Sequence, residues 1–146
     1  MSSLAVGLGE LYFNQRYKPG SILKFNMECD DPNRDTRYKF GIVLNKNTEE
    51  DEALLAITTT NHKFFDTGRF EDDILRIGVG EYPCFDKPTI ISLREIRSEP
   101  VARLKTLCIS KQLTFHGELT EVDLTVIKEK IIHSKVIEGK YKKRIV

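Results

Sequence analysis

The chain has 146 residues and a mass of 16.8 kDa, with 40% hydrophobic and 31% charged residues. These values are typical of one globular domain with a single core, and no apolar run reaches the roughly 18 residues that cross a bilayer. The 23 basic and 22 acidic side chains give a net charge of +1. Binding to nucleic acid would therefore require local clusters of basic residues rather than a basic chain.

The N-terminus has no basic region ahead of its short apolar patch, so no secretory signal is predicted and we expect a cytoplasmic protein. Cys29, Cys84 and Cys108 are widely spaced and include no CxxC pair. This pattern argues against a disulfide framework and a zinc site, and it predicts reduced thiols. We expect no metal and no other cofactor.

Turn residues and apolar runs predict several short strands. Residues 1–17 have no sustained period and are expected to form an N-terminal arm, loosely held or packed as a short helix. After a Pro-Gly turn, residues 21–27 alternate as a strand does, and the polar residues 28–39 are expected to be a long exposed loop. The continuous apolar run at 40–44 is typical of a strand that is buried on both faces.

Further strands are predicted at residues 53–58, 74–79 and 89–93. Residues 94–103 mix charged residues with a proline and are expected to be irregular, whereas residues 104–115 are expected to supply one or two more strands.

The sequence predicts one helix near the end of the chain. Thr120 and Asp123 resemble a capping box, and Gly139 offers a stop. The apolar residues that follow the cap recur at helical spacing at Leu124, Ile127 and Ile131. Short strands followed by one helix predict a mainly β protein, a small β-barrel with a C-terminal α-helix packed on it. We expect this domain to span residues 18–139, with residues 140–146 as a basic tail.

Six short segments occur in an order and spacing that resemble the MazF/PemK family of toxins over about residues 18 to 135. These segments are Lys18–Ile22, Asp31-Pro32, Lys39–Asn45, Ala56–Thr59, Asp86–Ile90 and Gly117–Thr120. The resemblance implies an SH3-like barrel of the CcdB/MazF/PemK type. It also implies a homodimer, for which the apolar run at 40–44 is expected to supply the sheet surface.

The resemblance further implies a toxin-like endoribonuclease that cleaves single-stranded RNA without metal, using the 2′-hydroxyl as nucleophile, and that a cognate antitoxin neutralises. Such chemistry needs an acid or base near the reacting oxygens and a cation at the phosphorane. Thr58 occupies the family's threonine position, and Lys39 occupies its arginine position, with Arg37 two residues earlier as a possible substitute. Asp86 matches the aspartate of PemK-type members, although Cys84 replaces their arginine. The candidate catalytic residues are therefore Lys39, Thr58, Asp86 and Arg37.

The resemblance also suggests an RNA-binding set in the loops. We expect loops at about residues 28–39 and 59–69 to flank one concave groove. The candidate RNA-binding residues in and beside these loops are Arg34, Thr59, His62 and Lys63.

A second reading stays open: a catalytically weak or inactive barrel that binds RNA or a protein partner. Lysine at position 39 cannot make the bidentate contact of a guanidinium, and residues 28–39 lack the histidine of PemK-type members. Lys39 and Arg37 are otherwise ordinary solvated charges, Thr58 an ordinary strand residue, and Asp86 an ordinary turn residue.

Overall fold

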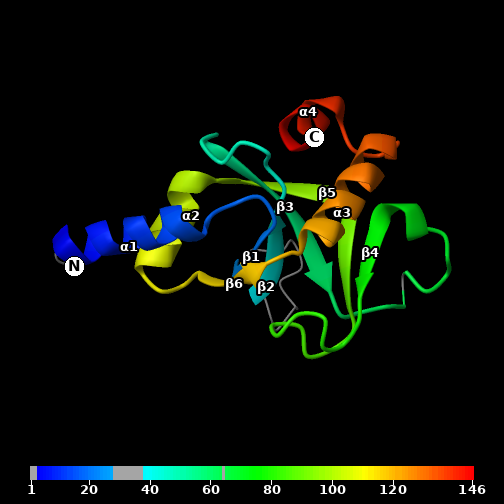
Figure 1. Ribbon diagram of the computed structural model, residues 1–146, viewed down its shortest axis with the longest axis horizontal. Coiled ribbons are helices and arrows are strands. Elements are labelled where there is room, and N and C mark those ends of the chain that lie inside the picture. Colours follow the sequence, from blue (N-terminus) through cyan, green and yellow to red (C-terminus); the bar gives the residue numbers. More distant parts are fainter. Residues whose placement is uncertain (1–2, 28–37, 64) are drawn as a thin grey trace.

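The computed structural model describes residues 3–27, 38–63 and 65–146, and these form a curled antiparallel sheet with helices on both faces (Figure 1). The strands are β1 (Ser21–Asn26), β2 (Tyr38–Val43), β3 (Glu52–Thr59), β4 (Ile74–Ile77), β5 (Thr89–Pro100) and β6 (Thr114–Glu118). The helices are α1 (Ser3–Arg16), α2 (Val101–Ile109), α3 (Glu121–His133) and α4 (Gly139–Ile145), with a 3-10 turn, η1 (Glu71–Asp73), before β4.

The sheet has the order β4-β5-β3-β2-β1-β6, and all of its neighbours are antiparallel. The 12-residue strand β5 pairs with β3 along its length, across an irregularity where Ala56 faces Ile96 but Ile57 faces Ser92. Extra residues on one strand bend it and increase its twist. The sheet therefore curls into a half-barrel, which confirms the predicted barrel-like sheet and C-terminal helix within a mixed α/β architecture.

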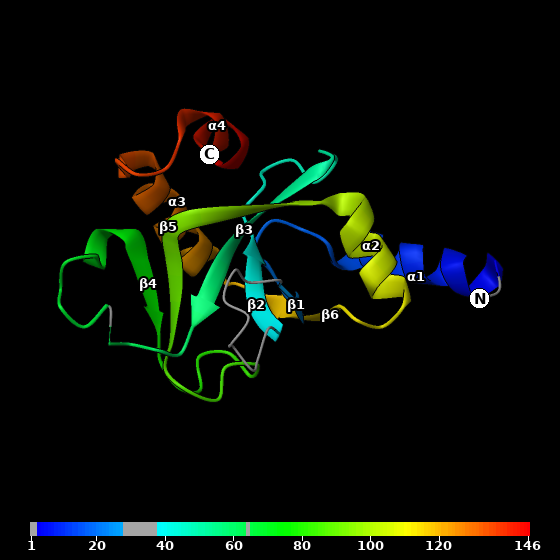
Figure 2. The same cartoon turned by 180° about the vertical axis from the view of Figure 1, so that it is seen from behind.

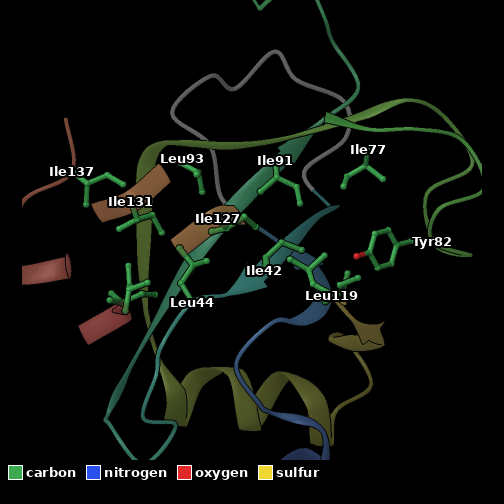
Figure 3. Packing of buried hydrophobic residues seen from close by; sticks show 14 of the residues in the cluster. Ile42, Leu44, Ile77, Tyr82, Ile91, Leu93, Leu119, Ile127, Ile131 and Ile137 are labelled. Atoms are coloured by element: carbon green, nitrogen blue, oxygen red, sulfur yellow. The ribbon is translucent and has the colours of Figure 1, made fainter. Parts of the chain in front are cut away.

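One face of the sheet is covered by α3 and α4. Ile127 and Ile131 of α3 are fully buried, and Figure 3 shows them beside the sheet residues Ile42, Leu44 and Leu93. These side chains come from the middle and the C-terminal part of the chain, so this core ties the C-terminal helices to the central strands.

The opposite face is covered by α1 and α2. Phe13 of α1 and Leu104 of α2 have no exposed surface, and they pack with Leu23, Phe25 and Leu55 of the sheet. Because side chains alternate along a strand, the central strands are apolar on both faces. The run at 40–44 is thus a doubly buried strand as predicted, but it is covered within one chain. Ile42, Val43 and Leu44 are fully buried, which contradicts the expectation that this run supplies a dimer surface.

The predicted cap of α3 is confirmed, because Thr120 Oγ1 accepts a hydrogen bond from the Asp123 backbone N–H at 3.2 Å. The end of the helix differs from the prediction. α3 stops at His133, and Gly139 begins α4 instead of ending α3. The last residues are consequently a packed helix rather than a free basic tail: Ile145 is fully buried, and Arg144 Nε donates to Glu50 Oε2 at 2.8 Å.

Residues 94–109 also differ from the prediction. Most of the segment expected to be irregular continues β5. Half of the segment 104–115, which was expected to supply strands, belongs to α2, and β6 begins at its end. The reason is tertiary packing: Leu104 and Cys108 lie one helical turn apart and both face α1. The N-terminal arm is the helix α1, which Figure 1 shows extending away from the sheet beside α2. Of the described residues, no helix is long and apolar enough to span a membrane.

Candidate functional site

The described residues of the predicted site gather at one end of the sheet, the lower end in Figure 2. In an antiparallel sheet, the end of one strand lies beside the start of its neighbour. Lys39 is the second residue of β2, and Thr58 and Thr59 are the last two residues of β3. Asp86 lies in the segment just before β5, at the same end. Arg34 and Arg37 lie outside the described residues, as do most of the loop at 28–39 and Cys29.

The register places Lys39 and Thr58 on opposite faces of the sheet. Lys39 pairs with Phe25, whose side chain is buried under α1 and α2, and directly opposed residues share a face. Ile57 packs in that same cluster, so the next residue, Thr58, faces the α3 side. The two candidate catalytic residues are therefore separated by the backbone of the sheet.

The loop after β3 approaches the segment before β5 through His62. Its Nε2 lies 2.8 Å from the Pro88 carbonyl oxygen, and since a carbonyl only accepts, Nε2 carries the proton. His62 thus contacts a residue that follows Asp86 by two positions in the chain, and Asp86 is exposed. Lys63 is exposed beside it. The structure thus groups three of the candidate residues at the rim of the sheet.

Thr59 has a local role in the same loop. Its Oγ1 accepts a hydrogen bond from the Asn61 backbone N–H at 3.1 Å, the pattern of a hydroxyl-stabilised turn. As the neighbour of Thr58 along the strand, it faces the same side as Lys39.

Thr58 belongs to a row of four side chains that crosses the sheet on the α3 side. We call this the Phe40 row, and its members are His116, Lys24, Phe40 and Thr58. Lys24 pairs directly with Phe40 on β2 and with Thr114 on β6. Thr58 closes the row, because its Oγ1 donates to the Phe40 carbonyl oxygen at 3.3 Å.

Phe40 is the centre of the row. The Lys24 ammonium lies 5.0 Å from the centroid of its ring, at a distance where cation and ring attract. The His116 imidazole meets the ring edge-on with centroids 5.2 Å apart, and the Phe85 ring does the same at 5.2 Å. A cation and an imidazole are therefore held against one aromatic ring, with Lys24 half-buried and His116 exposed.

His116 has an altered proton affinity. Partial burial lowers the pKa of its imidazole, and the nearby Lys24 charge lowers this pKa further. Both causes favour the neutral ring. The ring is also oriented, because its Nε2 lies 2.8 Å from Thr114 Oγ1. The lowered pKa therefore shifts the ring toward its neutral form.

Tyr38 adds an aromatic surface beside the row. It pairs with Asn26 two residues beyond the Lys24–Phe40 pair, so it faces the same side of the sheet as Phe40. Tyr38 is 48% exposed.

Two surface cavities lie apart from the row. One of about 410 Å³ lies between η1 and the end of α3, and its lining includes Asp72 and His133. The other, of about 590 Å³, is lined by residues that include Tyr17 and Glu50. Neither is lined by a member of the Phe40 row. Within the part of the chain that the structure describes, no group of three or more His, Cys, Asp or Glu side chains is arranged to hold a metal ion.

Sequence reasoning missed Lys24, His116 and Tyr38 as members of this surface. The alternation in β1 puts Lys24 on the face of Ile22, but the sequence does not say which strands flank β1. The pairing of β1 with both β2 and β6 brings these three residues together, and it joins segments about 90 residues apart in the chain. No local motif carries that information.

Comparison with protein-family models gives no match for this chain, and comparison with curated proteins gives no significant match.

Proposed function

We propose that the chain is a toxin-like, metal-independent endoribonuclease that cleaves single-stranded RNA at short sequences. The observation that supports this most is the Phe40 row, which places Thr58, a cation and an imidazole on one face of the sheet. Cleavage by the 2′-hydroxyl needs these kinds of groups: a proton acceptor and a positive charge near the phosphorus.

The surroundings of the row suit a single strand better than a duplex. Proteins that bind single strands combine positive charge along the backbone with aromatic rings on which bases stack. Lys24 supplies a charge at the row, and Lys63 and Lys87 are exposed in the adjoining loops. Tyr38 offers an accessible ring on the same face.

The proposal includes the finer assignment of the fold as an SH3-like barrel of the MazF/PemK type, a cytoplasmic location, a homodimeric state and a cognate antitoxin. The dimer needs an exposed apolar surface other than residues 40–44. On α1, Leu4, Leu8 and Leu11 recur at helical spacing and are 72%, 59% and 54% exposed. Sedimentation at micromolar concentration tests the homodimer and this surface on α1, because Leu8→Glu would convert a dimer into a 16.8 kDa species.

One observation favours the second candidate, a catalytically weak or inactive barrel that binds RNA or protein. Lys39 and Thr58 lie on opposite faces, so the pair suggested by the resemblance does not form one site. If cleavage depends on that pair, the chain binds without cutting.

The test is incubation of the purified chain with a mixed-sequence single-stranded RNA in excess chelator. The expected result is cleavage with 2′,3′-cyclic phosphate ends on the products and no cleavage of DNA of the same sequence, which lacks the nucleophile. Binding without cleavage would favour the second candidate. The absence of both binding and cleavage at micromolar protein would refute both candidates.

A further inference from the structure

We propose that His116 is the general base and Lys24 the phosphate-binding cation of the ribonuclease reaction, and that Thr114 positions the imidazole. This inference rests on the proposed function and names the groups that perform it. It moves the catalytic charge from Lys39 to the opposite face of the sheet.

The geometry comes from three neighbouring strands. Lys24 on β1 has Phe40 on β2 as one lateral partner and Thr114 on β6 as the other. The ammonium and the imidazole both contact the Phe40 ring, at 5.0 and 5.2 Å from its centroid. Because rigid strands carry all of these side chains, their relative positions are fixed before any substrate arrives.

Thr58 shares this face, whereas Lys39 does not. The Thr58 hydroxyl is held by the Phe40 carbonyl oxygen, and only 7% of the residue is exposed. Thr58 therefore forms the inner wall of the row. Among the described residues that make up or directly pair within the row, Lys24 is the cation.

Thr114 determines which imidazole nitrogen reacts. When Nε2–H donates to Thr114 Oγ1, 2.8 Å away, Nδ1 keeps its lone pair and accepts the substrate proton. Phe40 and Thr114, which contact the ring from β2 and β6, carry no charge. The Lys24 charge faces the ring from β1 and opposes its protonation. His116 is consequently a base at neutral pH rather than an acid.

The step balances without a co-reactant. His116 Nδ1 takes the proton of the RNA 2′-hydroxyl, and the 2′-oxygen forms a bond to the adjacent phosphorus. The bond from phosphorus to the 5′-oxygen breaks, and this oxygen takes a proton from water. The imidazolium returns its proton to solvent, leaving a 2′,3′-cyclic phosphate and a 5′-hydroxyl. Lys24 stabilises the charge that accumulates on the phosphorane oxygens.

The experiment measures kcat and its pH profile for single-stranded RNA in excess chelator. His116→Gln is expected to lower kcat by about 100- to 10,000-fold, the range for loss of a general base. Lys24→Ala is expected to lower kcat by about 100- to 1,000-fold, the range for loss of one charge-stabilising donor. His133→Gln on α3 and Lys135→Ala are the matched controls, and both should cleave like the unsubstituted chain.

The pH profile separates catalysis from a structural role. The unsubstituted chain should gain activity with rising pH as His116 loses its proton, and His116→Gln should lack this acid limb. Thr114→Val should move the limb to lower pH, because the imidazolium loses the oxygen that accepts from Nε2–H. Added imidazole should partly restore cleavage to His116→Ala. Melting temperatures close to that of the unsubstituted chain would show that the variants remain folded.

The outcomes distinguish the two proposals. If the unsubstituted chain cleaves RNA but His116→Gln or Lys24→Ala stays within about 3-fold of it, the assignment of these residues is wrong and the proposed function stands. The same holds if Lys39→Ala abolishes cleavage while Lys24→Ala does not. If the unsubstituted chain does not cleave, the proposed function and this assignment both fail. Binding of an RNA with a 2′-deoxy cleavage site then shows whether the binding alternative remains.

Discussion

The Tyr82 phenol donates a hydrogen bond to the Asp123 carboxylate, and it links the segment before β5 to the first turn of α3. The same oxygen accepts from the Thr120 backbone N–H at 3.0 Å. Tyr82 is only 6% exposed, and its ring lies 6.0 Å from that of Phe85, which in turn contacts Phe40. The contact therefore supports α3, and through Phe85 it also supports the Phe40 ring.

Tyr82→Phe is expected to destabilise the protein. The substitution keeps the ring but leaves the Thr120 N–H and the Asp123 carboxylate without this partner. Hydrogen bonds of this kind contribute about 1 to 2 kcal/mol, so the free energy of unfolding should fall by about that amount. Urea denaturation followed by circular dichroism measures the change. An unchanged midpoint would mean that water replaces the phenol at no cost.

Tyr17→Phe, the matched substitution on the other side of the sheet, is expected to act in the opposite direction. Tyr17 is 5% exposed and stacks on Phe13 with centroids 5.0 Å apart, but its hydroxyl has no hydrogen-bond partner among the described residues. Removing a buried, unpartnered hydroxyl relieves a desolvation cost. The free energy of unfolding should stay level or rise by up to about 1 kcal/mol. A loss larger than 1 kcal/mol would show that the hydroxyl has a partner in solution.

Both tyrosines should make the fold sensitive to alkali. Burial raises the pKa of Tyr17, the nearby Glu50 charge raises it further, and burial also raises the pKa of Tyr82. An unfolded tyrosine loses its proton near pH 10, whereas the folded side chains keep theirs to higher pH. Above about pH 10 the unfolded state therefore binds fewer protons, and the free energy of unfolding falls as pH rises.

Urea denaturation between pH 8 and 11 measures this slope, which should be shallower in Tyr17→Phe. Tyr12→Phe, at an exposed position on α1, is the control and should keep the slope of the unsubstituted chain. An equal slope in Tyr17→Phe would assign the alkaline effect to other groups.

The sequence predicts those parts of the fold whose signal is local. The alternation in β1, the doubly buried run of β2 and the Thr120 cap of α3 depend on neighbouring residues, and all three are present. α2 and α4 depend instead on distant partners. Leu104 is buried against the α1 side of the sheet, and Ile145 is buried among residues of β2, β3 and α3. Short helices of this kind gain their stability from tertiary packing rather than from propensity.

The residues of the candidate site likewise divide into those with a local sequence signal and those that depend on strand pairing. Thr58 and the strand end that carries it are identifiable from the chain order, because a threonine run follows an apolar strand. The cation on its face is not identifiable, since the resemblance points to Lys39 and only the register shows that Lys24 shares the face of Thr58. The strand pairing decides between the two lysines, and a single sequence does not fix that pairing.

The last prediction concerns Tyr38, the exposed ring beside the Phe40 row. If a base of single-stranded RNA stacks on it, Tyr38→Ala should weaken binding by about 5- to 150-fold, corresponding to the 1 to 3 kcal/mol of one base–aromatic contact. Tyr38→Phe keeps the ring face and should bind like the unsubstituted chain. Tyr12 on α1 is 42% exposed, close to the 48% of Tyr38, so Tyr12→Ala controls for the loss of any exposed ring. Fluorescence anisotropy with a labelled RNA that carries a 2′-deoxy cleavage site measures binding without turnover. Equal affinities for Tyr38→Ala and Tyr12→Ala would place the RNA elsewhere on the molecule.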